Sequence, residues 1–313
     1  MNYILYHDES KLAGYWHGML LVPEAKLDEL HSHMCLARTS HSYDGLVGIK
    51  YVRGHNPVRK LATSWMQIGI AGLASNLTNQ HLPYHMGNGT YGYVTSTIGA
   101  KFILFREKSE LKSLLGHPDY GSKMETTFRM GMKGGLHFLG DVNHPIHLAK
   151  MRFDGWEHYQ RHLDRDRIVG RLSGLREYCS ISNAPDVIDD RSSDHTRSDC
   201  QERIHCDMLQ LTDLLVGCGR SVLGQCTRKE HLEVAAPLTQ LIHKVRQGTK
   251  RMHNSRWNRS ICMSQCELRE EGWVFSPLEF AQTSKPRMSH LELFDENEDE
   301  VHVSTEDGPT SDL

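Results

Sequence analysis

The sequence has no hydrophobic run long enough to cross a membrane as a helix. Its most apolar stretch, from Leu61 to Leu77, is broken by Thr, Ser, Gln and Gly, whereas a span needs about 20 mostly apolar residues. The N-terminus also lacks the apolar core of an export signal, because Asp8 and Glu9 come too early. We therefore predict a cytoplasmic protein with no membrane partner.

The cysteines lack the spacing of a disulfide framework. The eight Cys are scattered and no C-x-x-C occurs, so free thiols in a reducing compartment are the better interpretation. Zinc is the rival hypothesis. It has little support, because Cys262-x3-Cys266 and His31-x-His33 are single pairs without a second pair at finger spacing.

Basic residues are missing from the C-terminal end. Residues 292–313 hold nine acids and no Lys or Arg, and removing those nine from the net charge of −3 leaves +6 on residues 1–291. A basic body suggests a polyanionic partner, with the acidic tail shielding or competing for the same surface. A tail that only aids solubility explains the same charges.

The rest of the chain has the composition and patterning of a globular α/β protein. Hydrophobic residues make up 38% of it and charged residues 24%. Short β-rich segments alternate with amphipathic ones. We expect strands at 2–7, 14–22, 46–52, 101–105 and 147–153, helices at 24–36, 58–76, 119–136, 164–178 and 207–223, and a further helix that begins at Pro237.

Two of the predicted strands are followed directly by an acid. Asp8 comes after the first strand and Asp154 after the strand 147–153, and these acids would be neighbours if the two strands pair. A lone acid at a strand end is more often a turn or cap residue. His7, beside Asp8, should point to the opposite face of its strand and pack there.

A third acid interrupts an apolar helix. Asp213 lies within the run from Leu209 to Val216, on one line of the helix with Gln210 and Gly217. Burying it unpaired would be costly, so it needs a metal, a cation or a strong hydrogen bond. Three convergent carboxylates suit Mg²⁺ or Mn²⁺, and two such ions can activate water and stabilise the leaving oxygen of a phosphodiester.

Two short motifs carry a family resemblance. The opening Tyr-His-Asp-Glu-Ser (residues 6–10) and the later Leu-Gln-Leu-Thr-Asp-Leu-Leu-Val-Gly (residues 209–217) resemble the bacterial and phage family called domain of unknown function 3800. The resemblance spans about residues 1–225. It implies a ribonuclease H-like fold, in which a mixed sheet is flanked by helices.

The same resemblance implies roles for the three acids. Asp8 matches the first metal-ligand position of the family and Asp213 the last, while Asp154 fits the middle one. The chain departs from the family at Lys11, where Gly is usual, and at Thr212, where Ala is usual. Neither departure removes a carboxylate.

The fourth catalytic acid is left open. Glu125 lies on the helix before the strand of the middle ligand, where ribonuclease H-like enzymes often carry a Glu, and Glu9, Asp189 and Asp190 compete for the role. An ion pair with Arg129, four residues later, explains Glu125 equally well.

Two basic stretches are candidate nucleic-acid contacts. Residues 243–259 hold six cations, no acid and one Trp, so phosphates could bind the cations while a base stacks on the indole. A solvated helix end would look the same. The residues are Lys244, Arg246, Lys250, Arg251, Arg256, Trp257 and Arg259, and a smaller cluster holds Lys50, Arg53, Arg59 and Lys60.

These patterns predict an α/β, ribonuclease H-like domain over residues 1–225 with a lid-like insertion at about 78–100. A helical and basic C-terminal extension (226–290) and a disordered acidic tail (291–313) would follow. The expected function is that of a metal-dependent nuclease acting on RNA or DNA. The setting in which the resembled family occurs suggests a role in bacterial defence or in a mobile element. The alternative is an inactive module of the same fold that binds nucleic acid or scaffolds a partner. A protein partner and a homo-oligomer are both left open.

Overall fold

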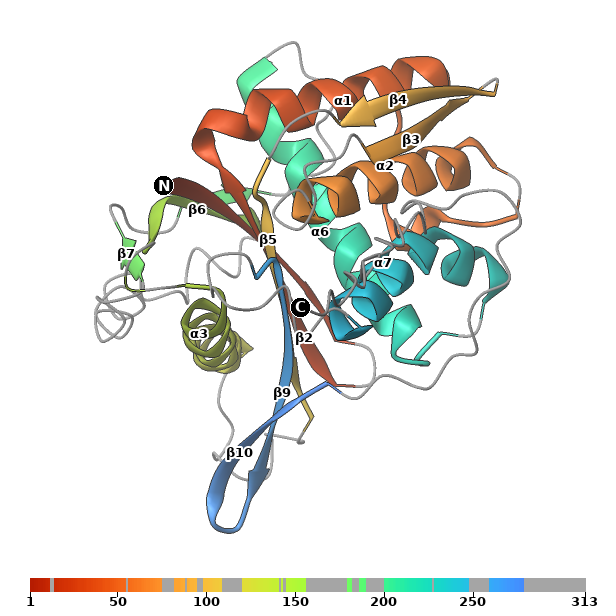
Figure 1. Cartoon of the computed structure of the whole chain (residues 1–313). Helices are drawn as coiled ribbons and strands as arrows, with labels where there is room; N and C mark the ends of the chain where they lie inside the picture. Colours follow the sequence, from red (N-terminus) through yellow and green to blue (C-terminus); the bar gives the residue numbers. More distant parts are fainter. Residues whose placement is uncertain are drawn as a thin grey trace, which may run out of the picture.

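The computed structural model of the chain is an α/β structure built on one mixed, eight-stranded sheet (Figure 1). The predicted helix at 164–178 and the acidic tail lie outside the described residues. The structure describes residues 1–11, 14–54, 56–74, 82–87, 89–94, 98–108, 120–140, 142, 145–155, 179–181, 186–189, 200–226, 228–247 and 259–278.

The sheet places the first strand near its centre. The order is β10-β9-β5-β2-β1-β6-β7, and β8 also pairs with β6. β1 is antiparallel to β2 and parallel to β6. The strands are β1 (Asn2–Ser10), β2 (Tyr15–Pro23), β5 (Lys101–Glu107), β6 (Ile146–Gly155), β7 (Cys179–Ile181), β8 (Asp186–Asp189), β9 (Ile261–Arg269) and β10 (Gly272–Pro277).

Helices cover both faces of the sheet. Helices α1, α2, α6 and α7 lie on one face and α3 on the other (Figure 1), and each face has its own hydrophobic core. Among the described helices, none combines the length and the apolar character that crossing a membrane requires. The helices are α1 (Leu27–Ser40), α2 (Pro57–Ala74), α3 (Tyr120–Leu139), α6 (Cys200–Val222) and α7 (Lys229–Gln247), with 3-10 turns η1 (Glu24–Lys26) and η2 (Ile49–Tyr51).

Two parts of the chain outside the predicted strands also form sheet. The predicted insertion contains a separate hairpin, β3 (Leu82–Gly87) and β4 (Thr90–Val94), and β3 packs against α1 and α2. Beyond residue 225 the chain forms α7, which packs on α2 and α6, and then β9 and β10, which extend the main sheet from β5.

Side chains of β1 alternate between the two cores. Ile4 and Tyr6 belong to the core on the α6 side, whereas Leu5 belongs to the core on the α3 side. His7 is buried against Phe128 of α3, which confirms the packing role predicted for it. By the same alternation, Asp8 lies on the face that α6 covers.

The strand predicted at 46–52 is wrong. This segment is a loop that ends in η2, and its backbone groups do not join the sheet. Instead the N–H of Val47 donates to Gln210 Oε1 (2.8 Å), and the N–H of Ile49 donates to Asp213 Oδ2 (3.3 Å). Side chains of α6 therefore satisfy the donors that a neighbouring strand would otherwise bond.

The helix start predicted at Pro237 is also wrong. The helix α7 begins at Lys229 and Pro237 lies inside it. A proline within a helix removes one backbone hydrogen bond, here the one to the carbonyl of Glu233, and crowds that turn. The apolar face of α7, buried in the core on the α6 side, offsets that loss.

Candidate functional site

Asp8 and Asp154 lie on neighbouring parallel strands. In the register of β1 and β6, His7 pairs with Phe153, and both of these side chains are buried toward α3. The next residue on each strand, Asp8 and Asp154, therefore points to the α6 side. The condition that the sequence left open, pairing of the two strands that carry these acids, is therefore met.

Asp213 reaches Asp8 from the helix above the sheet. The two carboxyl groups lie within hydrogen-bonding reach of each other. This contact requires a close approach of α6 to β2, because a Cβ at Gly18, the partner of Asp8 in the antiparallel register, would lie 2.0 Å from Val216 Cγ2. The loop before η2 also needs glycine, since a Cβ at Gly48 would lie 2.5 Å from Asp213 Oδ2.

The charges of both other acids act on Asp8. Burial raises the pKa of Asp8 well above its ordinary value, and the charges of Asp213 and Asp154 raise it further. Burial also raises the pKa of Asp213, although Lys50 and the hydrogen bonds from Ile49 and Asp8 oppose the rise. Two carboxyl groups can form a hydrogen bond only when one of them is protonated, and a cation can take the place of that proton.

Two cations lie close to these acids. The exposed Lys50 acts on both Asp213 and Asp8, and its Nζ lies 5.1 Å from the centre of the Tyr51 ring. Arg220, two turns after Asp213 on α6, also acts on Asp213, and its Nη1 donates to Ser10 Oγ (2.9 Å). We refer to Asp8, Asp154 and Asp213 with Lys50 and Arg220 as the carboxylate site.

Two of the candidates for a fourth acid, Glu9 and Glu125, lie on the other face of the sheet. Glu9 accepts a hydrogen bond from Tyr15 on the α3 side of the sheet and pairs with Lys11 at 3.8 Å. Glu125 is buried on α3, with its Oε1 3.3 Å from Nε of Arg129.

Of the remaining two candidates, Asp189 is the last residue of β8, which pairs with β6, and Asp190 is the next residue in the sequence. The backbone of Asp189 pairs with Gly155, next to Asp154, and Asp190 lies outside the described residues. Glu9 and Glu125 therefore occupy the opposite face from Asp213, and Asp189 is the candidate whose position in the sheet is near the site.

Most of the long basic stretch falls outside the described part of the chain. This holds for Lys250, Arg251, Arg256 and Trp257, and for the side chains of Lys244 and Arg246 at the end of α7. Arg259 is described, and it contacts α3: its guanidinium lies 4.4 Å from the centre of the Phe138 ring. In the smaller cluster, Arg59 pairs with Glu233 of α7, and Lys50 belongs to the carboxylate site.

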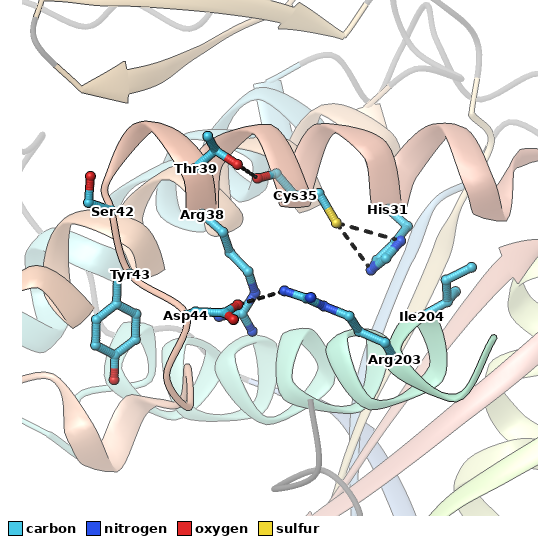
Figure 2. Close-up of a pocket in the computed structure, with 9 residues that line it drawn as sticks. All are labelled: His31, Cys35, Arg38, Thr39, Ser42, Tyr43, Asp44, Arg203 and Ile204. Carbon is cyan, nitrogen blue, oxygen red and sulfur yellow. Dashed lines mark hydrogen bonds and ion pairs between the residues drawn. The ribbon is translucent and has the colours of Figure 1, made fainter. Parts of the chain in front are cut away.

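A second cluster was not predicted from the sequence. His31 and Cys35 on α1 meet Asp207 on α6, and one ligand atom of each lies within 4.8 Å of the others. The two α1 residues line a cavity of about 550 Å³ (Figure 2). The signal for it was His31-x3-Cys35, which is one turn of a helix and puts both side chains on one face.

The pairs considered for zinc in the sequence are not close in this way. His33 Nδ1 lies 3.1 Å from the hydroxyl of Tyr84. Cys262 and Cys266 are on the strand β9, where four residues span about 13 Å. Two residues separated by three others lie on the same face of a helix, where they can bind one ion, but they lie too far apart along a strand.

Within the second cluster, hydrogen bonds and nearby charges change the pKa values of Asp207 and His31 more than burial does. Burial alone would raise the pKa of Asp207, yet the bond from His31 and the charge of Arg38 lower it. Burial alone would lower the pKa of His31, and its bonds with Asp207 and Cys35 raise it to about 9. Arg38 Nη2 donates to Asp207 Oδ1 at 2.7 Å.

Comparisons with known proteins do not assign this chain to a family. No model of a known protein family matches the chain, and no curated protein matches it. The family resemblance of the two sequence motifs stays a prediction. What the chain can do is therefore inferred from the two clusters and their surroundings.

Proposed function

We propose that the chain is a metal-dependent nuclease of the ribonuclease H-like type, which cleaves phosphodiester bonds of RNA or DNA at the carboxylate site. The single observation that carries the proposal is the convergence of three carboxyl groups, since Asp8 and Asp154 lie on neighbouring parallel strands and Asp213 reaches Asp8 from α6. Carboxyl groups this close repel one another when ionised, and a divalent cation removes that repulsion.

The donor set fits hard, divalent ions. The oxygens come from three carboxylates, which are the ligands that Mg²⁺ and Mn²⁺ prefer. Asp8 is influenced by the charges of both other acids, so Asp8, Asp154 and Asp213 are the residues that would hold the ions. Ions bound there would activate a water and stabilise the leaving oxygen.

The cations of the site supply the contacts to substrate. Lys50 is exposed beside the acids and can bind a phosphate next to the scissile one. Arg220 is held by Ser10 at the end of β1 and balances part of the negative charge on Asp213. The arrangement of an acid on a central strand and an acid on a late helix agrees with the two motifs that suggested the family.

The proposal is tested by incubating the full chain with labelled RNA, single-stranded DNA and duplex DNA in Mg²⁺, Mn²⁺ or chelator. We expect cleavage of at least one substrate with metal, none with chelator, and none by Asp213→Asn under any condition. Cleavage that persists in chelator or in Asp213→Asn would contradict the proposal.

A second function has one observation in its favour. Lys50 and Arg220 already act on Asp213, so the acids could be neutralised without a metal in a module that binds nucleic acid and does not cut it. Such a module would bind nucleic acid equally well in chelator and in Mn²⁺. A nuclease would bind substrate more tightly with the ion, because the ion contacts the phosphate.

A further inference from the structure

We propose that His31, Cys35 and Asp207 bind a divalent transition-metal ion of the zinc type, with the fourth coordination position left to water or to a ligand from the adjoining cavity. This site is separate from the carboxylate site. Asp207 lies six residues before Asp213 on α6, which is a rise of about 9 Å along the helix.

The distances between the donor atoms suit a tetrahedral ion. Zinc bonds of about 2.0 Å to nitrogen and oxygen and about 2.3 Å to sulfur would separate nitrogen from oxygen by about 3.3 Å and nitrogen from sulfur by about 3.6 Å. In the structure, His31 Nε2 lies 3.1 Å from Asp207 Oδ2 and 3.5 Å from Cys35 Sγ. These two distances match one coordination shell, and one ligand atom of each of the three residues lies within 4.8 Å of the others.

One adjustment would complete the geometry. Cys35 Sγ also lies 3.8 Å from His31 Nδ1, so the sulfur sits beside the imidazole ring. A rotation of the ring about χ2 would aim the Nε2 lone pair between Sγ and Oδ2. The ion would then replace the hydrogen bonds of His31 with Asp207 and with Cys35.

The surroundings hold the third ligand in place. The side chain of Asp207 is fully buried, and its second oxygen accepts a hydrogen bond from Arg38 Nη2 at 2.7 Å. Arg38 is itself fixed, because its Nη1 donates to the carbonyl of Gly45 (2.7 Å). A ligand whose free oxygen is bonded in this way is oriented before the ion arrives.

The cavity gives the site an open side. His31, Cys35 and Arg38 line it together with an ion pair between Arg203 and Asp44 (2.6 Å), as Figure 2 shows. A site with three protein ligands and one open position is typical of zinc that binds an exchangeable ligand. The mixed nitrogen, sulfur and oxygen donors favour zinc-type ions over Mg²⁺.

The test uses Co²⁺ as a spectroscopic probe in the full chain, after removal of metals with chelator. A cobalt–thiolate bond gives a charge-transfer absorption band in the near ultraviolet, which a site of carboxylates alone cannot give. We expect the band at one equivalent of Co²⁺, its loss when Zn²⁺ is added, and its absence in Cys35→Ser. Zinc affinity of this variant should fall by more than about 100-fold, since even outer-shell changes cost about 10–100-fold.

Cys226→Ser is the matched control. Cys226 Sγ lies 3.1 Å from His231 Nδ1, and this Cys–His pair is not part of a three-ligand group among the described residues. The control variant should keep the cobalt band. No band in the wild-type chain, or a band that survives in Cys35→Ser, would overturn the proposal.

A second measurement needs no variant and therefore no assumption about folding. Zinc should slow the alkylation of Cys35 by iodoacetamide in the wild-type chain, while the rate at Cys226, which is also half-buried, stays the same. Mass spectrometry of the two cysteine peptides gives both rates. Equal rates at Cys35 with and without Zn²⁺ would overturn the proposal.

Discussion

The carboxyl groups of Asp8 and Asp213 lie within hydrogen-bonding reach of each other, although one belongs to the first strand of the chain and the other to a helix some two hundred residues later. Two glycines permit this contact. Gly18 lets α6 approach β2, and Gly48 lets the loop before η2 donate to the same carboxyl group. A half-buried pair of acids, held by a strand, a helix and a loop, has the rigidity that a catalytic metal site requires.

Replacing Asp8 by Asn should separate activity from stability. Asp8→Asn keeps size and shape but removes a charge, so we expect loss of cleavage and weaker Mn²⁺ binding. The melting temperature of the metal-free protein should stay level or rise, because the repulsion by Asp213 and Asp154 is relieved. Cleavage assays, Mn²⁺ titration and thermal melts in chelator measure the three effects.

Glu9→Gln provides the matched control for this variant. It removes a carboxylate from the next residue of β1, but Glu9 lies on the α3 side and bonds to Tyr15. We expect normal cleavage and Mn²⁺ binding from it. If Asp8→Asn cleaves normally and melts at a lower temperature, then Asp8 only supports the fold and the site is wrongly assigned.

The metal-free protein should lose stability from the acid pair as pH rises. The pKa of Asp8 is raised in the folded chain above its ordinary value of 3.8, so the folded state binds more protons than the unfolded state above that pH. The free energy of unfolding then falls with rising pH until the raised pKa is passed. Denaturant melts in chelator should show that the free energy of unfolding of Asp8→Asn rises relative to that of the wild type as pH increases from about 4. A difference that does not change with pH would contradict the raised pKa of Asp8.

The strand pattern identified the two strands that carry Asp8 and Asp154, and the sequence left open whether these strands pair. The predicted strands 2–7 and 147–153 end one residue before the acids, whereas β1 and β6 include them, and the parallel pairing brings the two acids together. The line of Gln210, Asp213 and Gly217 on α6 also proved informative. Each of these residues contacts the segment from Val47 to Ile49, through hydrogen bonds or through close packing on the Ile49 side chain.

Other parts could not be predicted because they depend on tertiary contacts. The segment 46–52 has the composition of a strand, but α6 side chains bond its backbone and hold it as a loop. The cluster of His31, Cys35 and Asp207 needs the packing of α1 on α6, which no local pattern of either helix reveals.

Residues of the basic stretch should differ in what their replacement changes: nucleic-acid binding for some and stability for another. If it follows a phosphate backbone, Arg251→Ala with Arg256→Ala should weaken nucleic-acid binding and reduce the slope of log affinity against log salt by about two units. Arg259→Ala should act on stability instead, by about 0.5–1 kcal/mol, since its guanidinium lies over the Phe138 ring. Salt titrations and denaturant melts distinguish these effects. An unchanged slope in the double variant would leave the stretch as a solvated surface.

Lys50 gives the sharpest test of the carboxylate site, because its removal should move two affinities in opposite directions. Lys50→Gln deletes a cation that acts on both Asp213 and Asp8, so Mn²⁺ should bind more tightly. Nucleic acid loses one phosphate contact, so it should bind more weakly and the salt slope should fall by about one unit.

Opposite changes in the two affinities would rule out general damage to the fold, because such damage would weaken the binding of both Mn²⁺ and nucleic acid. Lys60→Gln is the matched control, since Lys60 is exposed on α2 and acts on His41. It should leave Mn²⁺ affinity unchanged. If Lys50→Gln instead leaves nucleic-acid binding intact and lowers the melting temperature, then Lys50 serves to neutralise the buried acids. In that case the metal-independent binding module becomes the better account of the chain.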